Sequence, residues 1–191
     1  MVAQPQKPTL FLDFDHTLFD TDQLRAWLGL HIESRIKEIE LGTLSFPDLT
    51  MMLYPDTLAF LKSAKRVYQI VLLTYTVNQH FQKGKISGSG IADFLDDTLI
   101  TTNTSGDSGK GKATKEYLAN HGAEGGGHVF VDDLLENISE VKKTNPNIRC
   151  IQIERAPSKN VNTSSVGFLA PDDRVKNLAE LLRLLPRIAT S

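Results

Sequence analysis

Residues 9–21, TLFLDFDHTLFDT, constrain the fold more than any other stretch, because they place acids directly after a short apolar run. Residues 10–12 are too few for a helix and are typical of a buried strand. Asp13 and Asp15 follow that run, and in open α/β sheets ligands bind beyond the carboxyl ends of the strands. Two neighbouring carboxylates repel each other unless a cation lies between them. The stretch predicts a metal-assisted site with one Asp as nucleophile, and its alternative is a solvated acidic turn.

Composition limits the protein to a few classes. A chain of 191 residues suits one domain, or one domain with a small insertion. The net charge of -2 gives no electrostatic reason to expect nucleic acid or a membrane as partner. No apolar run reaches the roughly 18 residues of a membrane span, and the N-terminus lacks the apolar segment of a signal peptide. The single cysteine, Cys150, lies in an apolar run, so we expect a buried thiol and a cytoplasmic protein.

The remaining pattern alternates strands with helices. Strands are expected over 9–14, 67–74, 96–102, 128–133 and 147–154, and helices over 22–40, 53–66, 78–86, 112–121, 134–144 and 175–185. Asp22 is a possible N-cap of the first helix, and Asp172 or Asp173 of the last. Alternation from residue 56 onward predicts a parallel sheet covered on both faces. Residues 21–54 interrupt it and are expected to form a small helical cap over the core, which comprises 9–20 and 55–191.

Polar residues end an apolar strand, or precede a helix, at four places along the chain. These are Asp13 with Asp15, Thr74, Lys110 or Lys112, and Asp132 with Asp133. The carboxyl ends of parallel strands meet at one edge of a sheet, so these groups can converge. D-F-D-H-T resembles motif I, D-x-D-x-T, of the haloacid dehalogenase (HAD) superfamily, and the four places in this order resemble its motifs I to IV. The resemblance implies a doubly wound, Rossmann-like α/β core with a small helical cap.

The resemblance also implies roles for the first two motifs. Asp13 would attack phosphorus and form an aspartyl-phosphate. Asp15 would protonate the departing alkoxide and then activate water, an acid that dehalogenases of the superfamily lack. Thr74 and Tyr75 would bind the phosphoryl group through the threonine hydroxyl and a nearby backbone N–H. His16 is expected to be a loop residue.

The later motifs supply charge. A lysine would neutralise phosphate: the K-G-x-A pattern of relatives favours Lys110, whereas distance to the helix could favour Lys112. Mg²⁺ would be held by Asp13, Asp15 through its backbone carbonyl, and Asp132. Asp133 is expected outside the ligand set. Where longer family motifs have another Asp, this chain has Glu136, so the role of that position stays open.

These expectations describe a magnesium-dependent phosphomonoester hydrolase acting on a small phosphorylated metabolite such as a sugar phosphate or nucleotide. The alternatives are a phosphotransferase or mutase on the same scaffold, and a non-catalytic HAD-like binding module. The apolar stripe of Trp27, Leu28 and Ile32 is expected to pack the cap rather than to bind substrate. The chain is expected to be a monomer or a homodimer.

Overall fold

A computed structural model describes residues 7–102, 108–121, 126–155 and 167–189, with side chains to Leu185. Its centre is a parallel sheet of six strands in the order β3-β2-β1-β4-β5-β6. The strands are β1 (Thr9–Leu12), β2 (Gln69–Tyr75), β3 (Asp97–Thr101), β4 (Val129–Asp132), β5 (Arg149–Ile153) and β6 (Asp173–Val175). The order reverses direction beside β1, which confirms the predicted doubly wound α/β fold.

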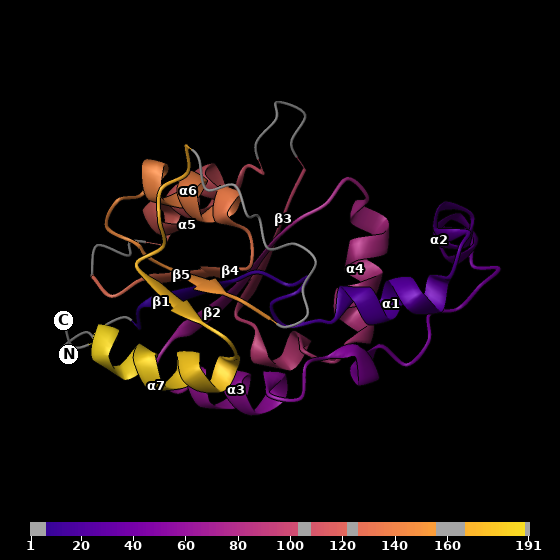
Figure 1. Cartoon of the computed structure of the whole chain (residues 1–191), viewed down its shortest axis with the longest axis horizontal. Helices are drawn as coiled ribbons and strands as arrows, with labels where there is room; N and C mark the ends of the chain where they lie inside the picture. The colour runs from indigo at the N-terminus through magenta and orange to yellow at the C-terminus, as the bar shows by residue number, and fades with distance from the viewer. Residues whose placement is uncertain (1–6, 103–107, 122–125, 156–166, 190–191) are drawn as a thin grey trace.

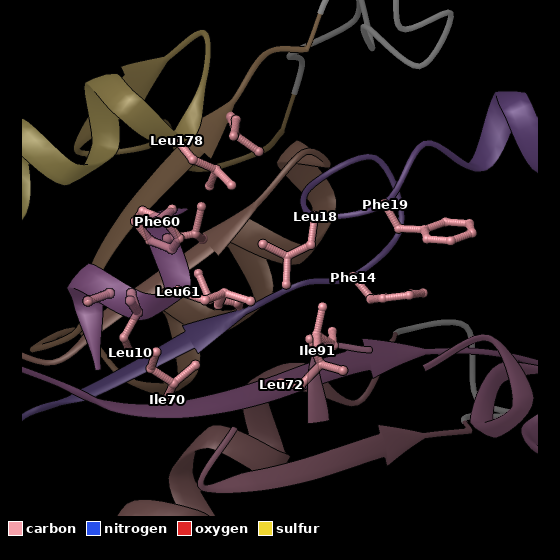
Figure 2. Close-up of a cluster of buried hydrophobic side chains, with 14 of the residues drawn as sticks. Leu10, Phe14, Leu18, Phe19, Phe60, Leu61, Ile70, Leu72, Ile91 and Leu178 are labelled. Atoms are coloured by element: carbon pink, nitrogen blue, oxygen red, sulfur yellow. The ribbon is translucent and has the colours of Figure 1, made fainter. Parts of the chain in front are cut away.

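Helices cover both faces of the sheet (Figure 1). Helices α3 (Thr57–Ala64) and α7 (Leu178–Ala189) lie on one face, and α5 (Lys110–Asn120) and α6 (Leu135–Thr144) lie on the other. Successive residues of a strand point to opposite faces. Leu10 therefore packs in the cluster that contains Phe60 and Leu178 (Figure 2), whereas Phe11 packs in the cluster that contains Tyr117 and Ile138.

The end of the chain differs from the prediction. Asp173 does not cap the last helix but lies in β6, which the sequence analysis missed. Asp172 accepts a hydrogen bond from the backbone N–H of Cys150 at 2.8 Å, and so connects the residue before β6 to β5. Helix α7 begins only at Leu178, after Asn177, whose Oδ1 accepts from the N–H of Glu180 at 2.9 Å. Cys150 is buried, as expected.

Residues 21–54 form α1 (Thr21–Leu28), α2 (Ile32–Glu40) and the 3₁₀ helix η1 (Leu49–Met52). The single helix predicted over 22–40 is wrong, because Gly29 adopts a φ of 70° and separates α1 from α2. Asp20, rather than Asp22, caps α1 and accepts from the N–H of Gln23 at 3.0 Å. We call residues 21–54 the insertion; its status as a separate cap stays a prediction.

The insertion packs on α4 (Gln79–Gly88) at one end of the molecule (Figure 1). The two surfaces approach closely at glycines. A Cβ atom at Gly84 would lie 2.7 Å from the ring of Phe46, and one at Gly88 would lie 2.8 Å from Leu49. The remaining short helix, η2 (Ala92–Phe94), precedes β3. Among the described residues, no helix combines the length and apolar character needed to cross a bilayer.

Candidate active site

A buried ion cluster joins the ends of β1 and β4. Asp13 directly follows β1 and Asp132 ends the neighbouring β4, and Asp13 N–H donates to the carbonyl of Val131 at 3.0 Å. Lys110, the first residue of α5, points between the two acids. Its Nζ lies 2.6 Å from Asp13 Oδ1 and 2.7 Å from Asp132 Oδ2. The structure thus brings three chain-distant groups together, as the motifs predicted.

The structure also shows which of the two candidate lysines lies in the site. Lys110 is buried in the cluster, with 1% of its surface exposed. Lys112 lies on the outer face of α5, where its ammonium pairs with Glu116 at 3.7 Å. A solvated pair of this kind contributes little energy. Of the two alternatives that the sequence left open, only Lys110 lies in the site.

Asp133 extends the acidic cluster. Carboxylate oxygens of Asp13, Asp132 and Asp133 lie within 4.8 Å of one another. Oδ2 of Asp133 is buried without a hydrogen-bond partner, whereas both oxygens of Asp132 accept from Asn137 Nδ2 at 3.0 Å. A buried, unpartnered carboxylate oxygen among other acids fits a divalent cation with a preference for oxygen ligands. Asp133, which we expected outside the ligand set, is therefore a candidate ligand; Glu136 is not part of this cluster.

The electrostatics of the cluster favour a cation. Burial raises the pKa of Asp13 to about 7; Lys110 opposes this shift, and Asp132 adds to it. Burial, with the charges of Asp132 and Asp13, raises the pKa of Asp133 to about 9. Burial alone would lower the pKa of Lys110, but its two carboxylate partners outweigh burial and raise it. Three acids thus share one lysine, and a divalent ion would balance the excess negative charge.

Asp15 belongs to a second network. Its carboxylate accepts hydrogen bonds from the hydroxyl of Thr21, from the ammonium of Lys85, and from Gln82 Nε2 at 2.8 Å. Gln82 Nε2 also lies 2.9 Å from Thr74 Oγ1, so the network reaches the end of β2. Burial alone would raise the pKa of Asp15, but the charge of Lys85 and these hydrogen bonds lower it. Asp15 is therefore an ionised side chain held in one orientation.

Sequence reasoning missed Lys85 and Gln82. Both lie on α4, three residues apart, and so on the same face of the helix. The three-residue spacing of these two polar residues, on the helix directly after the strand that ends near Thr74, was the signal in the sequence that could have identified them. The carboxylate of Asp15 points to these residues rather than into the acidic cluster, so only the backbone carbonyl of Asp15 remains as its predicted metal ligand; the structure leaves that role a prediction.

A cavity of about 410 Å³ lies between the sheet edge and the insertion. The predicted catalytic, metal-binding and phosphate-binding residues line it, apart from Asp132: these are Asp13, Asp15, Thr74, Tyr75 and Lys110. Its opposite wall comes from the insertion and α4, through Leu24, Leu28, Ile32, Ile36 and Phe81. Leu28 and Ile32, expected only to pack the insertion, therefore face this cavity. Trp27 instead contacts the guanidinium of Arg35, whose carbon lies 4.7 Å from the ring centroid.

The loop after Asp15 is fixed from several sides. His16 has a φ of 57°, which is rare for a residue other than glycine, and its N–H donates to the carbonyl of Phe19 at 2.8 Å. Arg155, beyond β5, donates from Nη2 to the carbonyl of Thr17 at 2.9 Å. Arg155 also binds both carboxylate oxygens of Asp56 at 2.9 and 3.1 Å. The loop that carries Asp13 and Asp15 is thus anchored to both α3 and β5.

The comparisons with known proteins give a fold. No family model and no curated protein matches the sequence. Among solved structures, a haloacid dehalogenase-like hydrolase from Burkholderia xenovorans matches with a TM-score of 0.76 at 17% identity, over 96% of this chain and 99% of that one. A HAD phosphatase from Thermococcus onnurineus matches with a TM-score of 0.61 at 19% identity, over 93% and 97%. The L-2-haloacid dehalogenase from Xanthobacter autotrophicus matches with 0.62 at 15%, over 95% and 99%. The chain has the fold of the haloacid dehalogenase-like hydrolases, the superfamily that its motifs resemble.

Proposed function

We propose that the protein is a magnesium-dependent hydrolase of small organic phosphate monoesters that acts through an aspartyl-phosphate. One observation carries the proposal: Asp13 lies against Lys110 and two further acids, at an edge of the sheet that opens on a cavity. The second acid, Asp15, lines the same cavity. Similarity to the fold of HAD-like hydrolases, one of them described as a phosphatase, supports this reading.

Asp13 is the proposed nucleophile. Transfer of a phosphoryl group needs placement and charge stabilisation more than a strong base, so a carboxylate suffices. Lys110, 2.6 Å from Asp13, would neutralise phosphoryl oxygens that approach it. Asp13, Asp132 and Asp133 would hold Mg²⁺, with the backbone carbonyl of Asp15 as a further ligand. When bound, the ion supplies positive charge to the phosphoryl oxygens.

Asp15 would move the proton. In the first half-reaction the departing alkoxide needs a proton, and in the second half-reaction the attacking water must lose one. Because Lys85 holds the pKa of Asp15 low, the ionised acid suits the second role. In the first role, Asp15 would donate in its protonated form, and the carboxylate that this leaves would take the proton from water in the second role. Thr74 and the backbone near Tyr75 would bind phosphoryl oxygens.

Dehalogenases share this fold, so fold alone does not assign the reaction. Asp15 argues for phosphate chemistry, because the resemblance implies that dehalogenases lack this acid. A mutase or phosphotransferase would need a cavity closed to water, and the insertion is small. A binding module without activity would be expected to have lost one of the acids.

Phosphate release from a panel of monoesters, with Mg²⁺ and with EDTA, tests the proposal. The wild-type protein should release phosphate only with Mg²⁺, and Asp13→Asn should lose about 10³-fold or more in rate while its circular dichroism stays unchanged. Chloride release from a 2-chlorocarboxylic acid is measured in parallel. Chloride release without phosphate release, or full phosphatase activity in Asp13→Asn, would contradict the proposal.

A further inference from the structure

The cavity has two chemically different ends. Near the sheet, its lining is charged, with Asp13, Asp15 and Lys110. Opposite, it is apolar: α1 contributes Leu24 and Leu28, α2 contributes Ile32 and Ile36, and α4 contributes Phe81. A phosphate bound at the charged end would direct its ester group toward this apolar wall, because the insertion covers that side of the cavity.

The side-chain amides of Asn78 and Gln82, next to the wall, form hydrogen bonds with other groups of the protein. Asn78 accepts from the N–H of Phe81 at 3.0 Å and donates to Glu40 Oε1 at 2.7 Å. Gln82 Nε2 donates to both Asp15 and Thr74, and its Oε1 accepts from Lys85 at 3.0 Å. These amides therefore offer little hydrogen bonding to a substrate.

Other polar side chains also line the cavity, among them Arg25 and His16. Arg25 is an exposed residue that pairs with Asp22 at 3.8 Å. His16 is buried, and burial lowers its pKa, with the neighbouring acids opposing this effect. The side of the cavity that the insertion covers is mainly aliphatic, and sugar hydroxyls that lose water there without new partners are bound poorly. An alkyl or aryl group, by contrast, would bury apolar surface against this wall.

Building on the proposed function, we infer that the substrates are phosphate monoesters with an apolar leaving group, alkyl or aryl, rather than sugar phosphates. Sugar phosphates and nucleotides are the examples of substrate that the sequence led us to expect, and this inference favours apolar esters over sugar phosphates. The cavity volume of about 410 Å³ suits a ligand of small-molecule size. The apolar wall would favour apolar esters by binding them, so we expect the preference to appear as a difference in kcat/KM between substrates.

The test compares n-hexyl phosphate with glucose 6-phosphate in the presence of Mg²⁺. Both are monoesters of a primary alcohol, so they differ mainly in the hydroxyls that must be desolvated. We expect kcat/KM for n-hexyl phosphate to exceed that for glucose 6-phosphate by about 10-fold or more. Equal or higher values for glucose 6-phosphate would overturn the inference and leave the proposed function standing. Phosphate release from neither ester, nor from p-nitrophenyl phosphate, would contradict the proposed function itself.

A matched pair of variants locates the selectivity. Ile32 lines the cavity as the first residue of α2. Leu30 is a nearby residue that is 98% exposed and does not line it. Ile32→Asn should lower the ratio of the two kcat/KM values about 10-fold, whereas Leu30→Asn should leave the ratio unchanged. An unchanged ratio in a folded Ile32→Asn protein would overturn the inference.

Discussion

Lys85 connects α4 to the loop that carries the proposed catalytic acids, Asp13 and Asp15. Its ammonium pairs with Asp15 and lies 5.4 Å from the ring centroids of both Phe14 and Phe19. The side chain is only 5% exposed. A buried cation is tolerated because it is paired, and loss of either partner leaves the other charge uncompensated. Lys85 is therefore expected to be a positioning residue for Asp15.

Lys85→Met tests this role at the scale of one residue. Without the ammonium, burial should raise the pKa of Asp15, so the acidic limb of the pH–rate profile should move to higher pH. We also expect kcat to fall about 10²-fold, because general acid–base catalysis by Asp15 is impaired. Lys112→Met, on the exposed face of α5, is the matched control and should behave as wild type. An unshifted pH profile in Lys85→Met would show that Lys85 does not act through Asp15.

The acids of the candidate site could be predicted from the sequence, whereas the lysines could be predicted only in part, for a physical reason. Asp13 and Asp15 follow an apolar strand and Asp132 ends another, and the end of a strand determines which edge of the sheet a residue reaches. Lys85 lies on a helix with a weak apolar pattern, where sequence does not reveal which polar residues turn inward. The same ambiguity left Lys110 and Lys112 as alternatives, and their different burial could be learned only from the packing of α5.

At the scale of elements, the close packing of α5 on α6 positions Lys110. Gly111 donates its N–H to Glu140 Oε1 at 2.7 Å. A Cβ atom at Gly111 would lie 2.9 Å from the backbone carbonyl of Glu140 and 2.6 Å from Thr144 Oγ1. A backbone carbonyl within a helix cannot move away cheaply, so a side chain at position 111 would push the two helices apart.

Gly111→Ala is expected to lower the free energy of unfolding by about 1–3 kcal/mol through overpacking. Because Lys110 is the adjacent residue, phosphatase activity should fall as well. Chemical denaturation and the rate of phosphate release measure the two effects. Gly126→Ala, where the added atom meets nothing within 4 Å, is the control and should change stability by about 0.5 kcal/mol or less. Equal stability of the two variants would contradict this account of the α5–α6 contact.

Most elements could be predicted because their apolar runs are long enough to show a period. Strand β6 was missed because three residues, two of them charged, carry no such signal. The break between α1 and α2 was missed because the apolar spacing continues across Gly29, whereas its positive φ depends on the turn. The sequence therefore predicted the sheet and its helices better than the ends of the elements.

At the scale of the whole molecule, stability is expected to depend on pH through the acidic cluster. The folded-state pKa is about 7 for Asp13 and about 9 for Asp133, both above the ordinary value of 3.8. An acid with a raised pKa holds its proton more tightly in the folded state, so it contributes most to stability below pH 3.8, where it is protonated. This contribution is lost as the pH rises through the folded-state pKa values to about 9. Between about pH 5 and pH 9, where Asp15 with its lowered pKa stays ionised, the protein without metal should therefore have a melting temperature that falls.

Magnesium should reverse this loss, because the ion binds the ionised carboxylates. We expect the melting temperature with Mg²⁺ to exceed that with EDTA by about 4 °C or more at pH 9, and by less at pH 5. Thermal unfolding at the two pH values measures the difference, and Asp133→Asn should reduce it. A shift that is absent, or larger at pH 5, would contradict the assignment of this cluster as a cation site.

The central claim is that Asp13 takes the phosphoryl group. The most direct test is mass spectrometry of the Asp15→Asn protein, acid-quenched after mixing with Mg²⁺ and a phosphate monoester that the wild-type protein hydrolyses. Asp15→Asn should slow hydrolysis of the intermediate, so the account predicts a mass increase of one phosphoryl group, mapped to the peptide that contains Asp13. A phosphoryl group on another residue, or phosphate release without any adduct in the wild type or the variant, would contradict it.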